Sequence, residues 1–358
     1  MAYTTIDDPS AHFQTALWSG DGSTNNAITN DGNSNLQPDF VWIKKRTNAD
    51  DHILANTSSG ATKYLISNTT GTEQTYSGNV KSFDSNGFTV GDGNQINQGS
   101  NTFVGWQWKA NGGNRTTFSA SGNQLAGGYQ ANTTAGFSIV DYTGNATNGA
   151  TFPHGLGATP TIAIIKDRTN AGDGGGTNWI VAYTIVDGST DRVYLNGTNA
   201  HYDLPDGSTE FRADFDSNNV TLGTWNNINA SGTHIAYVFT PIQGYSKFGR
   251  YTGNNNADGP FVYTGFKPAW VMIKNADASE IWRIFDDKRD TYNVMEKGLY
   301  PNLNNAEGSG TPRLDFLSNG FKLRDSGNAL NDSGANLIYM AFAQNPLVAS
   351  NNVIALAR

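Results

Sequence analysis

Carboxylates are the residues of this chain whose chemistry could make an enzyme, but their spacing does not suit one. Glycoside hydrolysis needs two carboxyl groups that face each other across a cleft. The chain has five glutamates, and no two of them stand two residues apart on one predicted strand beside aromatic residues. Most aspartates lie in turn contexts such as "DDP" and "GDG". We therefore expect no catalytic residues.

Cysteine and histidine offer no further site by their spacing. The chain has no cysteine, which excludes disulfides, thiolate metal sites and cysteine nucleophiles. Its five histidines are far apart in the sequence, without the His-x-His or His-x-x-x-His spacing that suits a metal. A Gly-x-Ser-x-Gly nucleophile elbow is also missing. The sequence therefore indicates no cofactor, with calcium as the one exception to consider.

Two stretches could bind a ligand. "DLPDGSTEFRAD" brings together Asp203, Asp206 and Glu210, whose hard oxygens are the ligands that calcium prefers. This stretch lacks the full twelve-residue calcium loop, so turn formation is the preferred interpretation and calcium the alternative. Trp225, in the loop-like segment "LGTWNNINASG", is the tryptophan that we expect to be most exposed. Because exposed aromatic rings can stack on sugars, it is the candidate glycan contact.

The composition predicts a chain made mainly of β-strands. Gly, Asn, Thr and Ser are abundant, and only 15% of the residues are charged. Gly and Asn tolerate the positive φ angles of tight turns, whereas long helices would need more Leu, Ala, Glu and Lys. The net charge is −8 and the basic residues are scattered, so we expect no binding to nucleic acid. We also expect no membrane insertion and no signal peptide, since no window approaches 18 apolar residues and the amino terminus lacks a secretory pattern.

A nine-residue motif occurs three times and indicates an internal repeat. The copies are "FDSNGFTVG" from Phe83, "FDSNNVTLG" from Phe215 and "FLSNGFKLR" from Phe316. An Asn-Gly pair between apolar residues is a strong signal for a tight turn between two strands, so we predict a hairpin corner in each copy. The turn residues that we expect to adopt positive φ are Asn86, Gly87, Asn319 and Gly320, with Asn218 as a weaker version in the second copy.

A second signature precedes this motif in each copy. Proline stands six residues before lysine in "PDFVWIK", "PTIAIIK" and "PAWVMIK". These runs are apolar almost throughout, which is typical of a strand covered on both faces. The residues that define the signature are Pro38 and Lys44, Pro160 and Lys166, and Pro268 and Lys274.

Because the signatures keep the same order in all three copies, the chain divides into three units. We predict an all-β fold of three tandem β-sandwich or jelly-roll-like units of about 100 residues, each packed independently. The predicted segments are an N-terminal arm (1–11), unit 1 (12–110), a flexible or extended Gly/Asn/Ser/Thr connector (111–136), unit 2 (137–244), unit 3 (245–346) and a C-terminal arm (347–358).

The repeated signatures resemble an uncharacterised family of virion structural proteins found in marine bacteriophages. The resemblance rests on "LQPDFVWIKKR" and "GWQWKANGG" in the first unit, on "YTGNATNGATFPHGLGATPTIAIIK" in the second, and on "DFLSNGFKLR" and "IYMAFAQNP" in the third. It spans most of residues 12–346. Members look like tail-associated, fibre or capsid-surface components, some of them described as lectin-like, and no catalytic residues carry over from them.

The resemblance implies a non-enzymatic virion protein on the particle surface, assembled in the host cytoplasm. The leading interpretation is a tail or fibre component that contacts host-surface glycans. A decoration protein that cements capsid or tail subunits is the alternative, and a carbohydrate-degrading tail enzyme comes third. The expected partners are other virion proteins and further copies of the chain, with a trimer favoured on grounds of closed symmetry.

Overall fold

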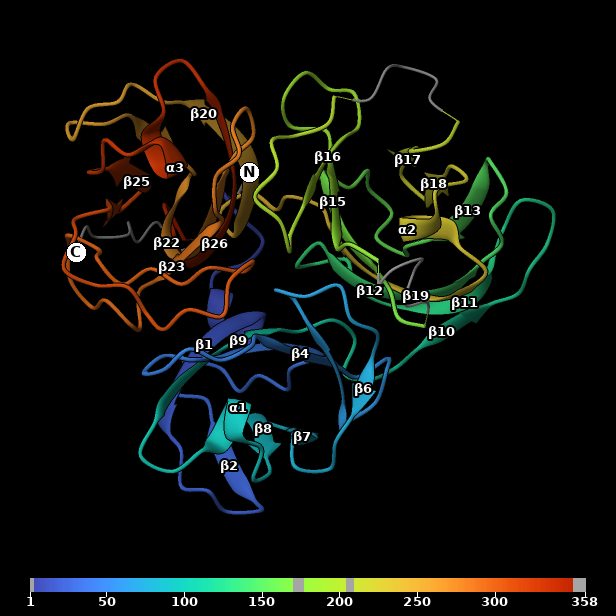
Figure 1. Ribbon diagram of the computed structural model, residues 1–358, viewed down its shortest axis with the longest axis horizontal. Helices are drawn as coiled ribbons and strands as arrows, with labels where there is room; N and C mark the ends of the chain where they lie inside the picture. The colour runs from blue at the N-terminus through green and yellow to red at the C-terminus, as the bar shows by residue number, and fades with distance from the viewer. Residues whose placement is uncertain (1–2, 170–176, 204–208, 350–358) are drawn as a thin grey trace.

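The computed structural model describes residues 3–169, 177–203 and 209–349. Its regular structure is almost entirely antiparallel β-sheet, arranged as three lobes around a common centre (Figure 1). Each lobe is a sandwich of one large sheet and one three-stranded sheet, which confirms the predicted all-β fold of three sandwich units. The large sheets lie toward the centre, and the small sheets lie on the outside (Figure 1).

The first lobe has a large sheet with the strand order β1-β9-β3-β4-β5-β6 and a small sheet with the order β2-β8-β7. Its helical segments are the 3-10 helix η1 (Pro9–Ala11) before β1 and the single turn α1 (Asn94–Asn97) before β9. The strands are β1 (Phe13–Ser19), β2 (Asn26–Thr29), β3 (Phe40–Lys45), β4 (Ile53–Asn56), β5 (Lys63–Ile66), β6 (Gln74–Thr75), β7 (Val80–Asp84), β8 (Gly87–Val90) and β9 (Thr102–Trp108).

The second lobe has a large sheet with the order β10-β11-β12-β19-β14-β15-β16 and a small sheet with the order β13-β18-β17. The turn α2 (Asn226–Asn229) precedes β19. The strands are β10 (Thr116–Phe118), β11 (Ala126–Asn132), β12 (Phe137–Gly144), β13 (Ala150–Pro153), β14 (Ile162–Asp167), β15 (Ile180–Tyr183), β16 (Asp191–Tyr194), β17 (Ala213–Phe215), β18 (Asn219–Leu222) and β19 (Gly232–Phe239).

The third lobe has a large sheet with the order β20-β26-β22-β23 and a small sheet with the order β21-β25-β24. The turn α3 (Asn328–Asn331) precedes β26. The strands are β20 (Ser246–Thr252), β21 (Phe261–Tyr263), β22 (Phe266–Asn275), β23 (Arg283–Asp286), β24 (Leu314–Leu317), β25 (Gly320–Leu323) and β26 (Asn336–Pro346). Four large-sheet strands and all small-sheet strands therefore follow the same order in every lobe.

Each helical turn ends in a buried asparagine that the sequence analysis missed. The signal was the short repeat "NQIN", "NNIN" and "NALN". Each amide braces the loop after β1, β12 or β20, because its oxygen accepts a backbone N–H there and its nitrogen donates to a carbonyl two residues further on. The bonds run from Asn97 to Asp21 and Ser23, from Asn229 to Asn145 and Thr147, and from Asn331 to Asn254 and Asn256.

None of the helices in the described ranges is long and apolar enough to cross a membrane.

The large sheets bury both of their faces, and this corrects the expectation that the units pack independently. One face of each sheet forms the core of its own sandwich, whereas the other face meets the sheets of the other two lobes in a shared central core. The ring centroid of Phe342 lies 5.4 Å from that of Phe13, 5.9 Å from that of Phe239 and 5.8 Å from that of Trp270. Phe342 therefore contacts rings from all three lobes.

The three lobes are joined head to tail by one repeated backbone hydrogen bond. The residue two positions after each signature lysine offers its carbonyl to a loop of the neighbouring lobe. These bonds run from Glu307 N to Arg46 O (2.8 Å), from Glu73 N to Arg168 O (2.9 Å) and from His201 N to Ala276 O (2.6 Å). The first lobe thus contacts the third, the second contacts the first, and the third contacts the second, which closes a ring within one chain.

Side chains at two junctions add an ion pair, and the third junction differs. Arg46 and Arg168 each bind a glutamate in bidentate fashion, Glu307 at 2.9 Å and Glu73 at 2.8 Å. At the third junction the equivalent of the glutamate is His201, which lies 3.7 Å from both Asp191 and Asp277.

A ring N–H at each junction also donates to a backbone carbonyl of the neighbouring lobe. Trp42 donates to Nδ1 of His52, so the other ring nitrogen of His52 carries the proton at the first junction. The contacts are His52 Nε2 to Tyr300 O, Trp179 Nε1 to Ile66 O and Trp282 Nε1 to Tyr194 O, each at 2.9 Å.

The signature lysines are fully buried beside these junctions. Each ammonium donates to the carbonyl of the next residue: Lys44 at 2.6 Å, Lys166 at 2.8 Å, and Lys274 to Asn275. Loss of hydration lowers the pKa of each lysine from 10.5 to about 8. The prolines mark strand entries: Pro38 lies just before β3, Pro160 just before β14, and Pro268 at an irregularity in the pairing of β22.

Two segments predicted to lie outside the units are built into them. The connector contains β10 and β11, which extend the large sheet of the second lobe beyond β12. The N-terminal arm packs against the third lobe, where Tyr3 donates to Gly265 O at 2.7 Å and Ile6 enters the central core. The composition of both segments did not predict this ordered structure, because it contains few large apolar side chains. Few are needed when the rest of the fold already supplies a sheet edge or a core to pack against. Residues 350–358 of the predicted C-terminal arm lie outside the described residues.

We predict that Phe342→Ala destabilises the whole chain by about 3–5 kcal/mol, because it empties a site shared by three lobes. Chemical denaturation should show one transition, with all lobes unfolding together. Phe261→Ala is the matched control, since this ring is 47% exposed and its loss should change the unfolding free energy by less than about 0.5 kcal/mol. Separate transitions for the lobes would contradict the shared core.

A second prediction concerns pH. The three lysines have a folded pKa of about 8 against 10.5 when unfolded, so between pH 8 and about 10 the unfolded chain binds more protons and stability rises with pH. Each lysine contributes a slope of up to about 1.4 kcal/mol per pH unit. Above about pH 10 the unfolded tyrosines ionise, and buried Tyr237 and Tyr245, whose pKa burial raises, make stability fall again.

The measurement is the unfolding free energy from pH 7 to 11. Lys44→Met should remove about one third of the rise, since it removes one of three equivalent titrations. Lys81→Met, at an exposed position on β7, should leave the slope unchanged. A flat profile in the unmodified chain would show that burial does not lower the pKa of these lysines.

Candidate functional site

The nine-residue motif forms the hairpins β7–β8, β17–β18 and β24–β25 of the small sheets. Phe83 and Phe215 are half-buried against their sandwich cores, and Phe316 is fully buried. In each lobe the carbonyl of the turn asparagine accepts a hydrogen bond from just beyond the first small-sheet strand. These bonds run from Asn30 N to Asn86 O, from His154 N to Asn218 O and from Thr264 N to Asn319 O. The motif residues therefore hold each small sheet together.

The expected positive φ is wrong for four of the five turn residues. Gly87 has a φ of 117°, whereas Gly320 and the three asparagines lie outside the left-handed region. Glycine is required at these two positions because the backbone of the neighbouring strand passes too close for a Cβ atom. A Cβ on Gly87 would lie 1.9 Å from Ile28 O, and one on Gly320 would lie 2.1 Å from Val262 O.

Two of the three calcium candidates lie within the described residues. Asp203 and Glu210 are exposed, and Asp206 lies outside the described residues. Within residues 3–169, 177–203 and 209–349, no group of three His, Asp or Glu side chains has a geometry that could hold a metal ion. Calcium binding by this loop stays a prediction.

Trp225 is half-buried rather than exposed. The guanidinium of Arg192 lies 4.0 Å from its ring centroid, and the ring of Phe211 meets it edge-on at 5.3 Å. A cation over an aromatic ring is attracted by the negative face of the ring. Part of the surface expected to stack on a sugar is thus covered from within the protein, and glycan contact by Trp225 stays a prediction.

A pair of exposed aromatic residues lies instead on β21, an edge strand of the third lobe. Phe261 and Tyr263 are each 47% exposed, and side chains two residues apart on a strand point to the same face, about 7 Å apart. Lys247 donates to Tyr263 O at 2.7 Å and lies 5.3 Å from the centroid of the tyrosine ring. By strand register the equivalent positions hold Ala27 and Thr29 in the first lobe and Thr151 and Pro153 in the second.

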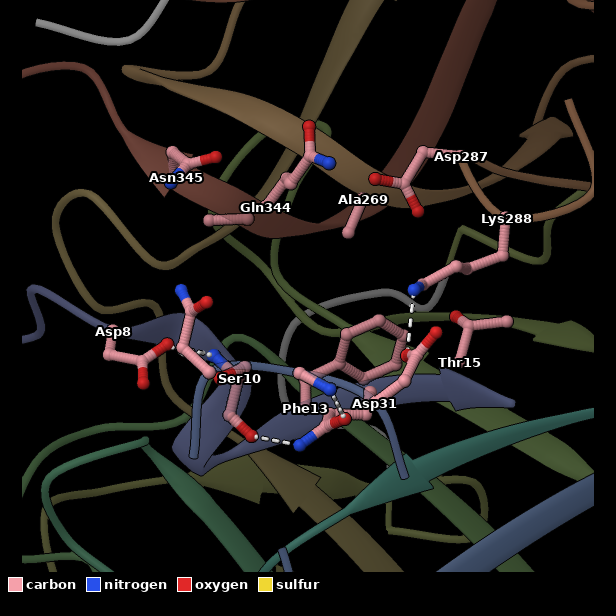
Figure 2. Close-up of a pocket in the computed structure, with 14 residues that line it drawn as sticks. Asp8, Ser10, Phe13, Thr15, Asp31, Ala269, Asp287, Lys288, Gln344 and Asn345 are labelled. Carbon is pink, nitrogen blue, oxygen red and sulfur yellow. Dashed lines mark hydrogen bonds and ion pairs between the residues drawn. The ribbon is translucent and has the colours of Figure 1, made fainter. Parts of the chain in front are cut away.

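A pocket of about 230 Å³ lies where the first and third lobes meet (Figure 2). Its walls come from η1, β1 and the loop after β2 on one side, and from β22, β26 and the loop after β23 on the other. Lys288 Nζ of the third lobe binds Asp31 of the first at 2.7 Å, and the Asp31 side chain is 72% exposed. This ion pair therefore marks the mouth of the pocket.

The wall contributed by the first lobe is held by the half-buried side chain of Asp8 and the buried side chain of Gln14. Asp8 accepts hydrogen bonds from the Ser10 and Ser34 hydroxyls, each at 2.6 Å. Burial raises the pKa of Asp8, but these hydrogen bonds outweigh it, and the pKa lies below its usual value. Gln14 donates to Ser10 O and accepts from Gly32 N, which fixes the loop after β2.

The pocket has the shape of a binding cavity, and the sequence analysis did not predict it. Asp31 and Lys288 stand 257 residues apart, and neither belongs to a repeated signature. Thr15, which lines the same pocket, is one threonine among many and belongs to no repeated signature. Only the closure of the ring brings these residues together.

Comparison with known proteins places the whole ring in one family. No curated protein and no solved structure matches the chain. A family model described as a domain of unknown function, DUF7483, matches residues 8–346, a span that includes all three lobes and both walls of the pocket. The chain belongs to the DUF7483 family.

Proposed function

We propose that this chain is a non-enzymatic structural protein on the surface of a bacteriophage particle, where it serves as a tail or fibre component that contacts host-surface glycans. The phage assignment draws on the resemblance of the repeated signatures to virion proteins. The other parts of the proposal draw on the use of the repeated residues and on the exposed residues where the lobes differ.

The observation that carries the proposal is the role of the residues that occur three times. The signature lysines, the residues two positions after them and the helix-ending asparagines brace loops or join lobes. A repeated element that serves packing in every copy suits a protein that must persist and present a surface. A ring that buries both faces of its large sheets resists local opening, which is the requirement for a particle exposed to the environment.

The glycan part of the proposal rests on β21. Two aromatic rings on one face of an edge strand, with Lys247 beside them, offer apolar faces and a hydrogen-bond donor to a sugar chain. The first two lobes carry smaller side chains at the same register, so this surface is specific to the third lobe.

We predict that Phe261→Ala/Tyr263→Ala weakens adsorption of the purified protein to host cells about tenfold or more, a loss of about 1.4 kcal/mol. Soluble host polysaccharide should block adsorption of the unmodified protein. Tyr292→Ala is the matched control, because this tyrosine is 79% exposed but lies outside β21.

The same samples separate the alternatives. Binding to assembled capsids but not to cells would favour a decoration protein, and release of reducing sugar would favour a tail enzyme. Imaging of virions labelled with an antibody to the chain tests the location on the particle. A trimer stays a prediction, which a measured mass of three chains in solution would support.

A further inference from the structure

The pocket between the first and third lobes contains a buried polar group that the fold itself does not use. Thr15 is only 5% exposed, and its side chain points from β1 into the pocket (Figure 2). Within the described part of the chain, its Oγ1 has no hydrogen-bond partner. Buried polar groups in native proteins are nearly always hydrogen-bonded, so a hydroxyl left over beside a cavity indicates a partner that binds there.

The charged groups around Thr15 suit a ligand rich in hydroxyl groups. Lys288 and Asp31 form their ion pair at the mouth, and Asp287, which is 5% exposed, lines the wall above. A carboxylate accepts hydrogen bonds from hydroxyls, an ammonium donates to them, and a threonine hydroxyl does both. Because carboxylates outnumber the ammonium, an anion is disfavoured. A neutral molecule with several hydroxyl groups can bond to the carboxylates, the ammonium and the threonine hydroxyl together.

The size of the pocket and its apolar lining further restrict the class of ligand. The cavity of about 230 Å³ is smaller than the range of about 300–1,000 Å³ that is typical for drug-sized ligands. It has room for one small ring inside it. Phe13, Ala269 and Ala343 line it with carbon, which matches the C–H faces that a sugar ring presents between its hydroxyls.

We infer that this pocket binds one neutral monosaccharide unit, with Thr15, Asp287 and the Lys288–Asp31 pair as its polar contacts. The inference rests on the proposed function only for the source of the sugar, a residue of a host-surface glycan. Because the contacts come from two lobes, the site exists only when the ring is closed. Bound sugar should therefore raise the unfolding temperature of the chain.

The test uses the full chain and free glucose, galactose, mannose and N-acetylglucosamine as probes, with binding read by saturation-transfer NMR and by the unfolding temperature. Thr15→Val keeps the shape of the side chain and removes only the unpartnered hydroxyl. It should leave the unfolding temperature unchanged or higher and weaken the binding of the preferred sugar about tenfold. Thr116→Val, on the exposed strand β10, is the matched control and should bind normally.

Lys288→Met provides a second variant, because it opens a partly exposed ion pair and should weaken sugar binding without unfolding the protein. The inference is overturned if none of the four sugars binds, or if Thr15→Val binds as the unmodified chain does. A large fall in the unfolding temperature of Thr15→Val would also overturn it, since the hydroxyl would then serve a buried water.

Host-cell adsorption separates this inference from the proposed function. Adsorption without sugar binding in the pocket would remove the inference and leave the proposed function standing. Sugar binding by the pocket in a protein that does not adsorb to cells would remove the proposed function and leave the inference standing.

Discussion

Burial of the second face of each large sheet is the constraint on which the rest of this structure depends. A sandwich covers one face of each sheet with its own small sheet, so the other face needs a partner. Here the three large sheets serve as partners for one another, and rings such as Phe13, Phe239 and Phe342 meet at the centre. The strands with the proline–lysine signature are apolar on both faces for this reason.

Ring closure follows from the same constraint. Each junction is head to tail, which in separate subunits would give a ring only if the rotation closed. Here the rotation closes after three lobes within one chain, and the carbonyls of Arg46, Arg168 and Ala276 accept the equivalent hydrogen bond at each junction. At the third junction, His201 between two aspartates stands in place of the arginine–glutamate pair. The same backbone hydrogen bond occurs at all three junctions, whereas the side chains differ.

Candidate binding surfaces occur where the three copies differ. The exposed rings of Phe261 and Tyr263 stand where the other lobes have small or polar side chains. The pocket beside Thr15 is built partly from Asp8 and η1, which precede β1 and have no counterpart in the repeated signatures. Repetition thus supplies the scaffold, and departures from repetition supply the surfaces that could distinguish one ligand from another.

The sequence by itself determined the secondary structure class, the threefold repeat and the hairpin corners, because alternation, turn residues and repeated letters act within a few residues. It could not determine what covers the second face of each large sheet. Asp31 and Lys288 are 257 residues apart, and Trp225, which precedes α2, is covered by Arg192 of β16. Burial of a side chain depends on the surfaces that other lobes bring to it, and only the tertiary structure decided those contacts.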